Sequence, residues 1–167
     1  MKLLINEFIK DYKKKTTWLY FLLSFGIILL NSYFTKRQFE DGIDAVKILS
    51  GITIVSAALA MVFTLIMLAN NLSQEYSKGT IKFLYTRPKS RSAILTAKIV
   101  LAFINYIIFL VVGTIFDFVT KNYVFFDGKV GLNYLNDTIE EGYFGRTVVR
   151  QLIITNLADL AVFIFFV

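Results

Sequence analysis

The chain has 167 residues, of which 56% are hydrophobic and 16% aromatic, and its formal net charge is +6. Because this apolar content exceeds that of a typical soluble domain, a bilayer is the expected solvent for much of the chain. Cys and His are both absent, which excludes disulfides and thiolate chemistry and removes the commonest general base and metal ligand. In so apolar a chain, membrane orientation explains the positive charge better than nucleic-acid binding, and we expect no nucleic-acid partner.

Residues 1–15 are predicted to form an amphipathic helix. Their apolar side chains recur at helical spacing on one face, at Leu4, Ile5, Phe8, Ile9 and Tyr12. Such a helix lies in the membrane interface rather than crossing the bilayer. The first long apolar run follows three lysines and ends without a small-residue cleavage site, so it reads as a membrane anchor rather than a signal peptide.

Four membrane-spanning segments are predicted, over residues 16–34, 48–69, 91–119 and 152–167. The first has aromatic residues at both ends, as interfacial belts do, and the second carries the small residues Gly51, Ser56, Ala57, Ala58 and Ala60, which favour close packing against other helices. The third begins after Pro88, which cannot continue a helix. The fourth is shorter than the roughly 20 residues that a span needs, so we expect further helices beyond Val167.

The loops between these spans differ in charge, which predicts their sides of the membrane. Residues 70–98 hold six Lys or Arg against one acid, and residues 1–15 also carry a positive excess. The loops at 35–47 and 120–150 each sum to zero. By the positive-inside rule, the N-terminus and the loop at 70–90 face the cytoplasm, and the loop at 120–150 lies outside. We therefore expect an all-α, multi-pass protein of the cell membrane.

The sequence contains no phosphate-binding glycine loop and no HExxH, GxSxG or CxxC motif. We therefore predict no catalytic residue, metal site or cofactor for this chain. Polar residues inside the predicted spans, namely Asn105, Asp117 and Asp159, are candidates for a transport path, because ionisable groups within spans are commonly functional. The alternative is that they are solvated at helix ends or make hydrogen bonds between helices.

The loop at 70–90 allows two interpretations. Leu72, Tyr76, Thr80 and Phe83 follow a helical stripe, which suggests a short helix at the membrane surface with a charged face toward the cytoplasm. The segment is then either a solvated loop held to anionic lipid by Lys and Arg, or a docking element for a cytoplasmic protein.

A longer pattern in this region is similar to that of a known family. The spacing Glu75-x-x-x-Gly79-Thr80-x-x-x-Leu84-x-Thr86-x-Pro88-x-Ser90-Arg91, together with Lys98, resembles the loop after the second span of bacterial ABC-type exporter permeases. The relatives are those of the bacitracin, lantibiotic and modulin-peptide exporter kind. The order of the interfacial helix, two spans, basic loop and third span agrees with the resemblance.

The resemblance implies a permease domain of about six spans, incomplete here at its C-terminal end, which pairs with a second permease subunit and with separate cytoplasmic ATPases. The loop at 70–90 would carry the coupling helix that seats in a groove of the ATPase, and that partner would bind ATP and Mg²⁺. The residues implied to take part in coupling are Glu75, Tyr76, Lys78, Gly79, Thr80, Arg87, Pro88 and Arg91. Glu75 would pair with an ATPase arginine, whereas Arg87 and Arg91 would bind acidic groups or lipid phosphates, unless they serve membrane topology alone.

The function expected on these grounds is ATP-driven export of an amphipathic peptide, drug or lipid, with this chain as the permease subunit and not an enzyme by itself. Two alternatives remain open. One is a membrane sensor or assembly subunit that recruits an ATPase without moving cargo. The other is an integral-membrane lipid-modifying enzyme.

Overall fold

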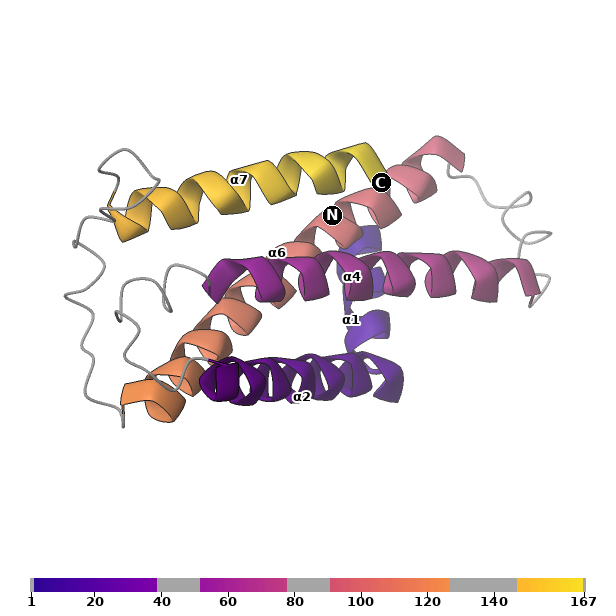
Figure 1. Ribbon diagram of the computed structural model, residues 1–167. Helices are drawn as coiled ribbons and strands as arrows, with labels where there is room; N and C mark the ends of the chain where they lie inside the picture. Colours follow the sequence, from indigo (N-terminus) through magenta and orange to yellow (C-terminus); the bar gives the residue numbers. More distant parts are fainter. Residues whose placement is uncertain (1, 39–51, 78–90, 127–146, 167) are drawn as a thin grey trace.

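The computed structural model describes residues 2–38, 52–77, 91–126 and 147–166, and its regular elements there are α-helices. They are α1 (Lys2–Tyr12), α2 (Lys15–Gln38), α4 (Ile52–Ser77), α6 (Arg91–Phe126) and α7 (Val148–Phe166). Figure 1 shows α2, α4, α6 and α7 running back and forth as a bundle, with the short α1 lying across it. The predicted all-α fold is confirmed.

The bundle has two distinct ends (Figure 1). At one, called here the α1 end, lie α1, the start of α2, the last turns of α4 and the first turns of α6. At the other, called the opposite end, lie the last turns of α2 and α6 and the first turns of α4 and α7. Helix α6 packs against α4, α2 and α1, and α7 packs against α4. Helix α6 is therefore the central helix of the bundle.

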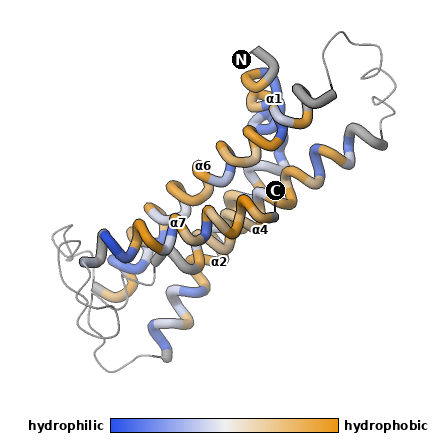
Figure 2. Tube along the Cα trace, turned by 90° about the horizontal axis from the view of Figure 1, so that it is seen from above, coloured by the Kyte–Doolittle hydropathy of each residue, from blue (hydrophilic) through white to orange (hydrophobic). Residues whose placement is uncertain are grey.

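Within the described part of the chain, three helices are long and apolar enough to cross a membrane: Lys15–Arg37, Val55–Gln74 and Leu95–Phe125. Figure 2 shows that hydrophobic residues fill the middle of the bundle and that hydrophilic residues gather toward the helix ends. The prediction of a multi-pass membrane protein is confirmed by these segments, which contain most of the first three predicted spans. The fourth predicted span falls in α7.

The helix bounds differ from the predicted spans most clearly in α4, which continues to Ser77 through residues that the sequence analysis assigns to a loop. The end of an apolar run is a hydropathy signal and not a helix stop, since neither Gly nor Pro occurs between Ile52 and Ser77. Helix α6 likewise continues to Phe126. At about 1.5 Å per residue it is about 54 Å long, well beyond the ~30 Å of a bilayer's hydrocarbon.

The core of the bundle is largely aromatic. Phe21 of α2 stacks on Phe109 of α6 with ring centroids 4.0 Å apart, and Tyr106 of α6 stacks on Phe163 of α7 at 4.5 Å. Around this core, Leu22, Ile115 and many other large apolar side chains are exposed, as lipid-facing residues are. Since lipid is as apolar as a protein core, stacked rings and close packing stabilise helix contacts here more than removal from water does.

Near the opposite end, α4 and α6 approach each other through small residues. A Cβ placed on Gly113 would come within 3.3 Å of Ser56 Cβ, and Ser56 Oγ lies 3.4 Å from Thr114 Oγ1. Ser56, Ala57 and Ala60 are all buried, which confirms the predicted packing role for these three. Ala58 is exposed, and Gly51 lies outside the described residues.

Candidate functional site

A tight turn at residues 13 and 14 joins α1 to α2 and sets the two helices at a steep angle (Figure 1). Side chains from the start of α2 cap the last carbonyl groups of α1: Thr17 Oγ1 donates to the Asp11 carbonyl at 2.6 Å, and Trp18 Nε1 donates to the Tyr12 carbonyl at 3.1 Å. Because these carbonyl groups have no partner within α1, the caps satisfy them and fix the direction of the turn.

The side chain of Asp11 is the centre of a polar network at the α1 end. Its carboxylate is almost fully buried, and the residue is 1% exposed. Asn71 Nδ2 of α4 donates to both carboxylate oxygens at 2.9 Å, and Lys14 Nζ donates to Oδ1 at 3.2 Å. Lys14 Nζ also donates to Asn71 Oδ1. A buried carboxylate is tolerated when it is paired and hydrogen-bonded in this way, and the network binds α1 to α4.

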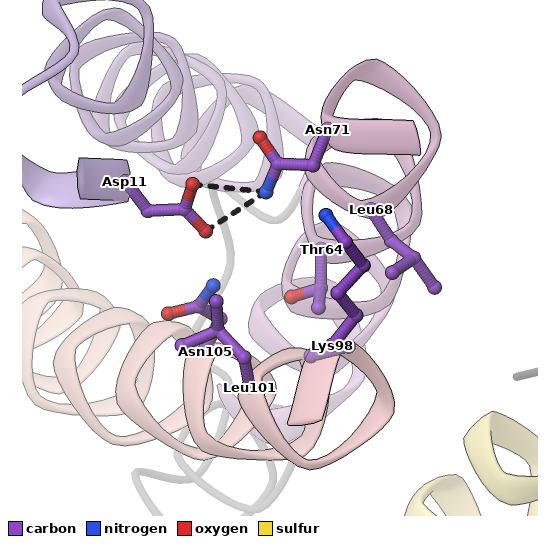
Figure 3. Close-up of a pocket in the computed structure, with 8 residues that line it drawn as sticks. Asp11, Thr64, Leu68, Asn71, Lys98, Leu101 and Asn105 are labelled. Carbon is purple, nitrogen blue, oxygen red and sulfur yellow. Dashed lines mark hydrogen bonds between the residues drawn. The ribbon is translucent and has the colours of Figure 1, made fainter. Parts of the chain in front are cut away.

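A small cavity of about 10 Å³ lies beside Asp11 and is lined also by Asn71, Thr64, Lys98 and Asn105. Figure 3 shows these side chains around it. Lys98 of α6 is only 4% exposed, and its Nζ lies 3.9 Å from Glu7 Oε2 of α1. Thr64 Oγ1 and Asn105 Oδ1 are buried without a hydrogen-bond partner among the described residues. Polar groups from α1, α4 and α6 therefore converge on one point.

The burial of this region changes the acidity of a neighbouring phenol. Burial, reinforced by the charge of Asp11, raises the pKa of Tyr12 from 10.0 to about 12. Its hydroxyl oxygen has no hydrogen-bond partner among the described residues, while its ring lies 4.5 Å from that of Phe8. Tyr12 thus contributes packing and stays neutral at ordinary pH.

The opposite end carries a different ion pair. Lys121 Nζ of α6 donates to Asp117 Oδ2 at 3.2 Å, one turn apart on the same helix, and both side chains are buried. Lys36 of α2 donates to the carbonyl of Val124 at 2.6 Å. Lys98 and Asp117 lie about 28 Å apart along the axis of α6 at ~1.5 Å per residue, close to the thickness of bilayer hydrocarbon. The charged groups of α6 therefore lie near the two edges of its apolar stretch.

Three of the predicted coupling residues lie at the α1 end. Glu75 and Tyr76 lie in the last turn of α4, one turn beyond Asn71, and Arg91 is the first residue of α6. Lys78, Gly79, Thr80, Arg87 and Pro88 lie outside the described residues. The coupling role of all these residues stays a prediction.

The three predicted transport-path residues do not gather at one place. Asn105 lines the cavity beside Asp11, and Asp117 pairs with Lys121 near the opposite end. Asp159 lies on α7, one turn before Phe163, and is partly buried. The role of these three residues in transport stays a prediction.

The sequence analysis did not identify Asp11, Asn71 or the pairing of Glu7 with Lys98. The available signal was an acid on the predicted interfacial helix three residues before Lys14, together with an Asn pair at the end of an apolar run. Within the described residues, no group of three or more metal-ligating side chains of the His, Cys, Asp or Glu type could hold a metal ion. The arrangement suits the mechanical joining of helices rather than bond-making chemistry.

Comparison with known families gives one match. The family model described as ABC-2 family transporter protein matches residues 3–163, which is nearly the whole chain. No curated protein and no solved structure matches the chain.

Proposed function

The chain belongs to the ABC-2 family of transporter proteins, and from this premise we propose that it couples ATP hydrolysis by a separate cytoplasmic ATPase to export of an amphipathic peptide, drug or lipid. Family membership makes it a membrane permease subunit of an ABC transporter, a transport subunit rather than an enzyme. The coupling, the direction of transport and the class of cargo are the proposed part.

The observation that best supports coupling is the network of Asp11, Lys14 and Asn71. Asn71 lies one helical turn before Glu75, the residue proposed to engage the ATPase. Because α4 continues as one helix through both positions, a push on its last turn moves Asn71 as well. The bonds from Asn71 to Asp11 and Lys14 then carry the displacement into α1 and the start of α2.

The same displacement reaches α6 by a second route. Glu7 of α1 lies next to Lys98 of α6, and α4 packs along α6 over much of its length. A helix pair joined at one end by polar bonds and along its length by close packing moves as a rigid body, as switching domains do. We propose that closure of the ATPases tilts α1, α4 and α6 together. In this view the α1 end is cytoplasmic.

The orientation is tested by thiol labelling in cells, which is clean because the chain has no cysteine. A membrane-impermeant maleimide is expected to label Tyr123→Cys, at a 68% exposed position near the opposite end, from outside intact cells. It is expected to label Ser77→Cys only after the membrane is opened. Labelling of Ser77→Cys in intact cells would invert the orientation and overturn the proposal.

Coupling is tested with the full chain co-expressed with a candidate ABC ATPase from the same genome. Glu75→Ala is expected to leave the protein in the membrane but to weaken co-purification of the ATPase and transport of a peptide and drug panel. Ser73→Ala, at an exposed position two residues earlier on the same helix, is the matched control and is expected to behave as wild type. Rescue of a Glu75→Arg variant by a charge-reversed ATPase arginine would establish direct pairing.

The alternatives give different outcomes in the same experiment. An ATPase that is recruited and stimulated through Glu75 without movement of any tested cargo would favour a sensor or assembly subunit. Unchanged recruitment and unchanged transport in Glu75→Ala would remove Glu75 from the coupling contact.

A further inference from the structure

A second, larger cavity lies at the α1 end and shares Asp11 and Asn71 with the first. Its volume is about 220 Å³, and its walls come from the turn, the start of α2 and the last turns of α4. The lining side chains that carry the argument are Lys14, Thr16, Tyr20, Met67, Asn70 and Gln74. Asp11, Lys14 and Asn71 of the coupling network also line it, so an occupant would touch that network.

The cavity lies at the depth of lipid headgroups. The apolar segment of α2 starts at Lys15 and that of α4 ends at Gln74, so the cavity lies where both segments leave the hydrocarbon. Trp18, near the start of the same helix, is 62% exposed, and its indole N–H donates a hydrogen bond to the Tyr12 carbonyl. Exposed Trp and Tyr at helix ends are typical of the membrane interface. The occupant therefore comes from the interface rather than from the bilayer centre.

The walls of the cavity suit an anionic, oxygen-rich group. Thr16, Asn70 and Gln74 place a hydroxyl and two amides in the walls, and Asn70 is oriented by its bond to Tyr20 Oη at 2.8 Å. Lys14 supplies the cation, and its ammonium has three donors, of which two are used on Asp11 and Asn71. The exposed lysines on either side, Lys13 and Lys15, keep the local charge positive despite Asp11.

Asp11 also lines the cavity, but its carboxylate is already satisfied by its neighbours. Both of its oxygens accept from Asn71, and Lys14 neutralises it. Met67, which is buried, forms an apolar patch of the same wall. A cavity with cationic and amide groups together with an apolar patch suits a glycerol phosphate with the first part of its acyl chains better than a free inorganic anion.

We propose that this cavity binds the phosphate-bearing headgroup of an anionic membrane phospholipid, with Lys14 as its cation and Thr16, Asn70 and Gln74 as hydrogen-bonding partners. The lipid occupies the angle between the α1–α2 turn and the end of α4. It is a resident of the membrane interface, distinct from any transported cargo.

The test uses Trp18, which is the only tryptophan of the chain and lies one turn beyond Lys14. The purified full chain is placed in vesicles that contain either brominated phosphatidylglycerol or brominated phosphatidylcholine, whose bromine quenches nearby indole fluorescence. Wild type is expected to favour the brominated phosphatidylglycerol about fivefold in effective affinity, as one well-placed lysine would produce near a membrane surface.

The variants separate a built site from general surface charge. Lys14→Gln is expected to abolish the preference for phosphatidylglycerol. Lys13→Gln removes the same charge from the neighbouring exposed position and is expected to keep the preference. Gln74→Leu removes an amide from the cavity wall without changing Asp11, and it is expected to lower the preference even if Lys14→Gln disturbs folding. Circular dichroism establishes that each variant is helical.

Three results would overturn the proposal. One is an absence of preference in wild type. Another is an equal loss in Lys13→Gln and Lys14→Gln, with Gln74→Leu unchanged, which would assign the effect to surface charge. The third is suppression of the preference by soluble glycerol phosphate at millimolar concentration, which would identify a site for free anions rather than for lipid.

Discussion

The two ends of the bundle hold their helices together by different means. At the α1 end, Asp11 and Asn71 join two helices through hydrogen bonds to a buried charge. At the opposite end, the buried pair of Asp117 and Lys121 lies within a single helix. There α4 and α6 meet through the close approach of Gly113 to Ser56.

This difference matters because a polar network and a close steric contact respond differently to force. A charge-assisted network is directional and strong where water is excluded, so it fixes the position of one helix end relative to another. The small-residue contact has a single long hydrogen bond, between the Ser56 and Thr114 hydroxyls at 3.4 Å, and otherwise depends on close packing, so it constrains the tilt of the helices less. The α1 end is thus the stiff end of the bundle, and the opposite end is its pivot.

The largest expected loss of stability comes from removing Asp11, the centre of the polar network at the stiff end. Asp11→Ala leaves the Asn71 amide and the Lys14 ammonium without their carboxylate, at an expected cost of about 2–4 kcal/mol in unfolding free energy. The value falls toward the low end of the range for buried pairs because the Lys14 side chain keeps 23% exposure and can turn toward water. Thermal unfolding of the detergent-solubilised protein, followed by Trp18 fluorescence, measures the loss.

A double-mutant cycle makes this test specific. If Asp11 acts through Asn71, the combined loss in Asp11→Ala with Asn71→Ala is expected to be smaller than the sum of the two single losses. Fully additive losses would mean that Asp11 stabilises only its own turn, and the contrast between the two ends would disappear.

The next largest effect is expected at the pivot. Gly113→Val places a branched side chain against Ser56, where a Cβ alone already lies at 3.3 Å, and is expected to cost about 1–3 kcal/mol through overpacking. Gly26→Val is the matched control, because a Cβ on Gly26 meets nothing within 4 Å. If both variants melt at the same temperature, the close approach of α4 and α6 does not support the bundle.

A smaller net change in stability is expected when both partners of the ion pair at the opposite end are replaced. Asp117→Leu leaves the buried Lys121 unpaired and is expected to cost about 1–3 kcal/mol. The double variant Asp117→Leu with Lys121→Leu is expected to be within about 1 kcal/mol of wild type, since an apolar pair of similar volume often replaces a buried ion pair without loss. If the double variant were as unstable as the single one, the two side chains would stabilise the fold by more than neutralising each other's charge.

The positions of the helices could be predicted from the sequence, whereas the hydrogen bonds that join one helix to another could not. Hydropathy located the core of each of the three spanning helices, because an apolar stretch is a local property of the chain. It did not locate the ends of α4, because Asn70 and Asn71 are polar yet compatible with a helix, and they stay helical through bonds to Tyr20 and Asp11. Those bonds join residues some fifty or sixty positions apart, a distance over which periodicity carries no information.

The polar residues within the spans show the same limit. Asn105 and Asp117 were both recognised as unusual from their apolar surroundings, yet the sequence did not show that one faces Asp11 and Lys98 while the other pairs with Lys121. A residue's type and depth can be read locally, whereas its partner depends on how the helices are turned toward each other.

The smallest expected effect concerns Tyr12 and separates packing from hydrogen bonding at the stiff end. Because its hydroxyl is buried without a partner among the described residues, Tyr12→Phe is expected to change stability at pH 7 by less than about 1 kcal/mol. The pKa raised to about 12 predicts a difference in alkali. Below pH 10 the phenol is neutral in both states; between pH 10 and 12 the unfolded chain loses its proton first, so wild type loses stability as the pH rises. Tyr12→Phe is expected to lose less over that interval in melting curves. A phenylalanine variant with the alkaline decline of wild type would mean that the phenol is as accessible to water as it is in the unfolded chain.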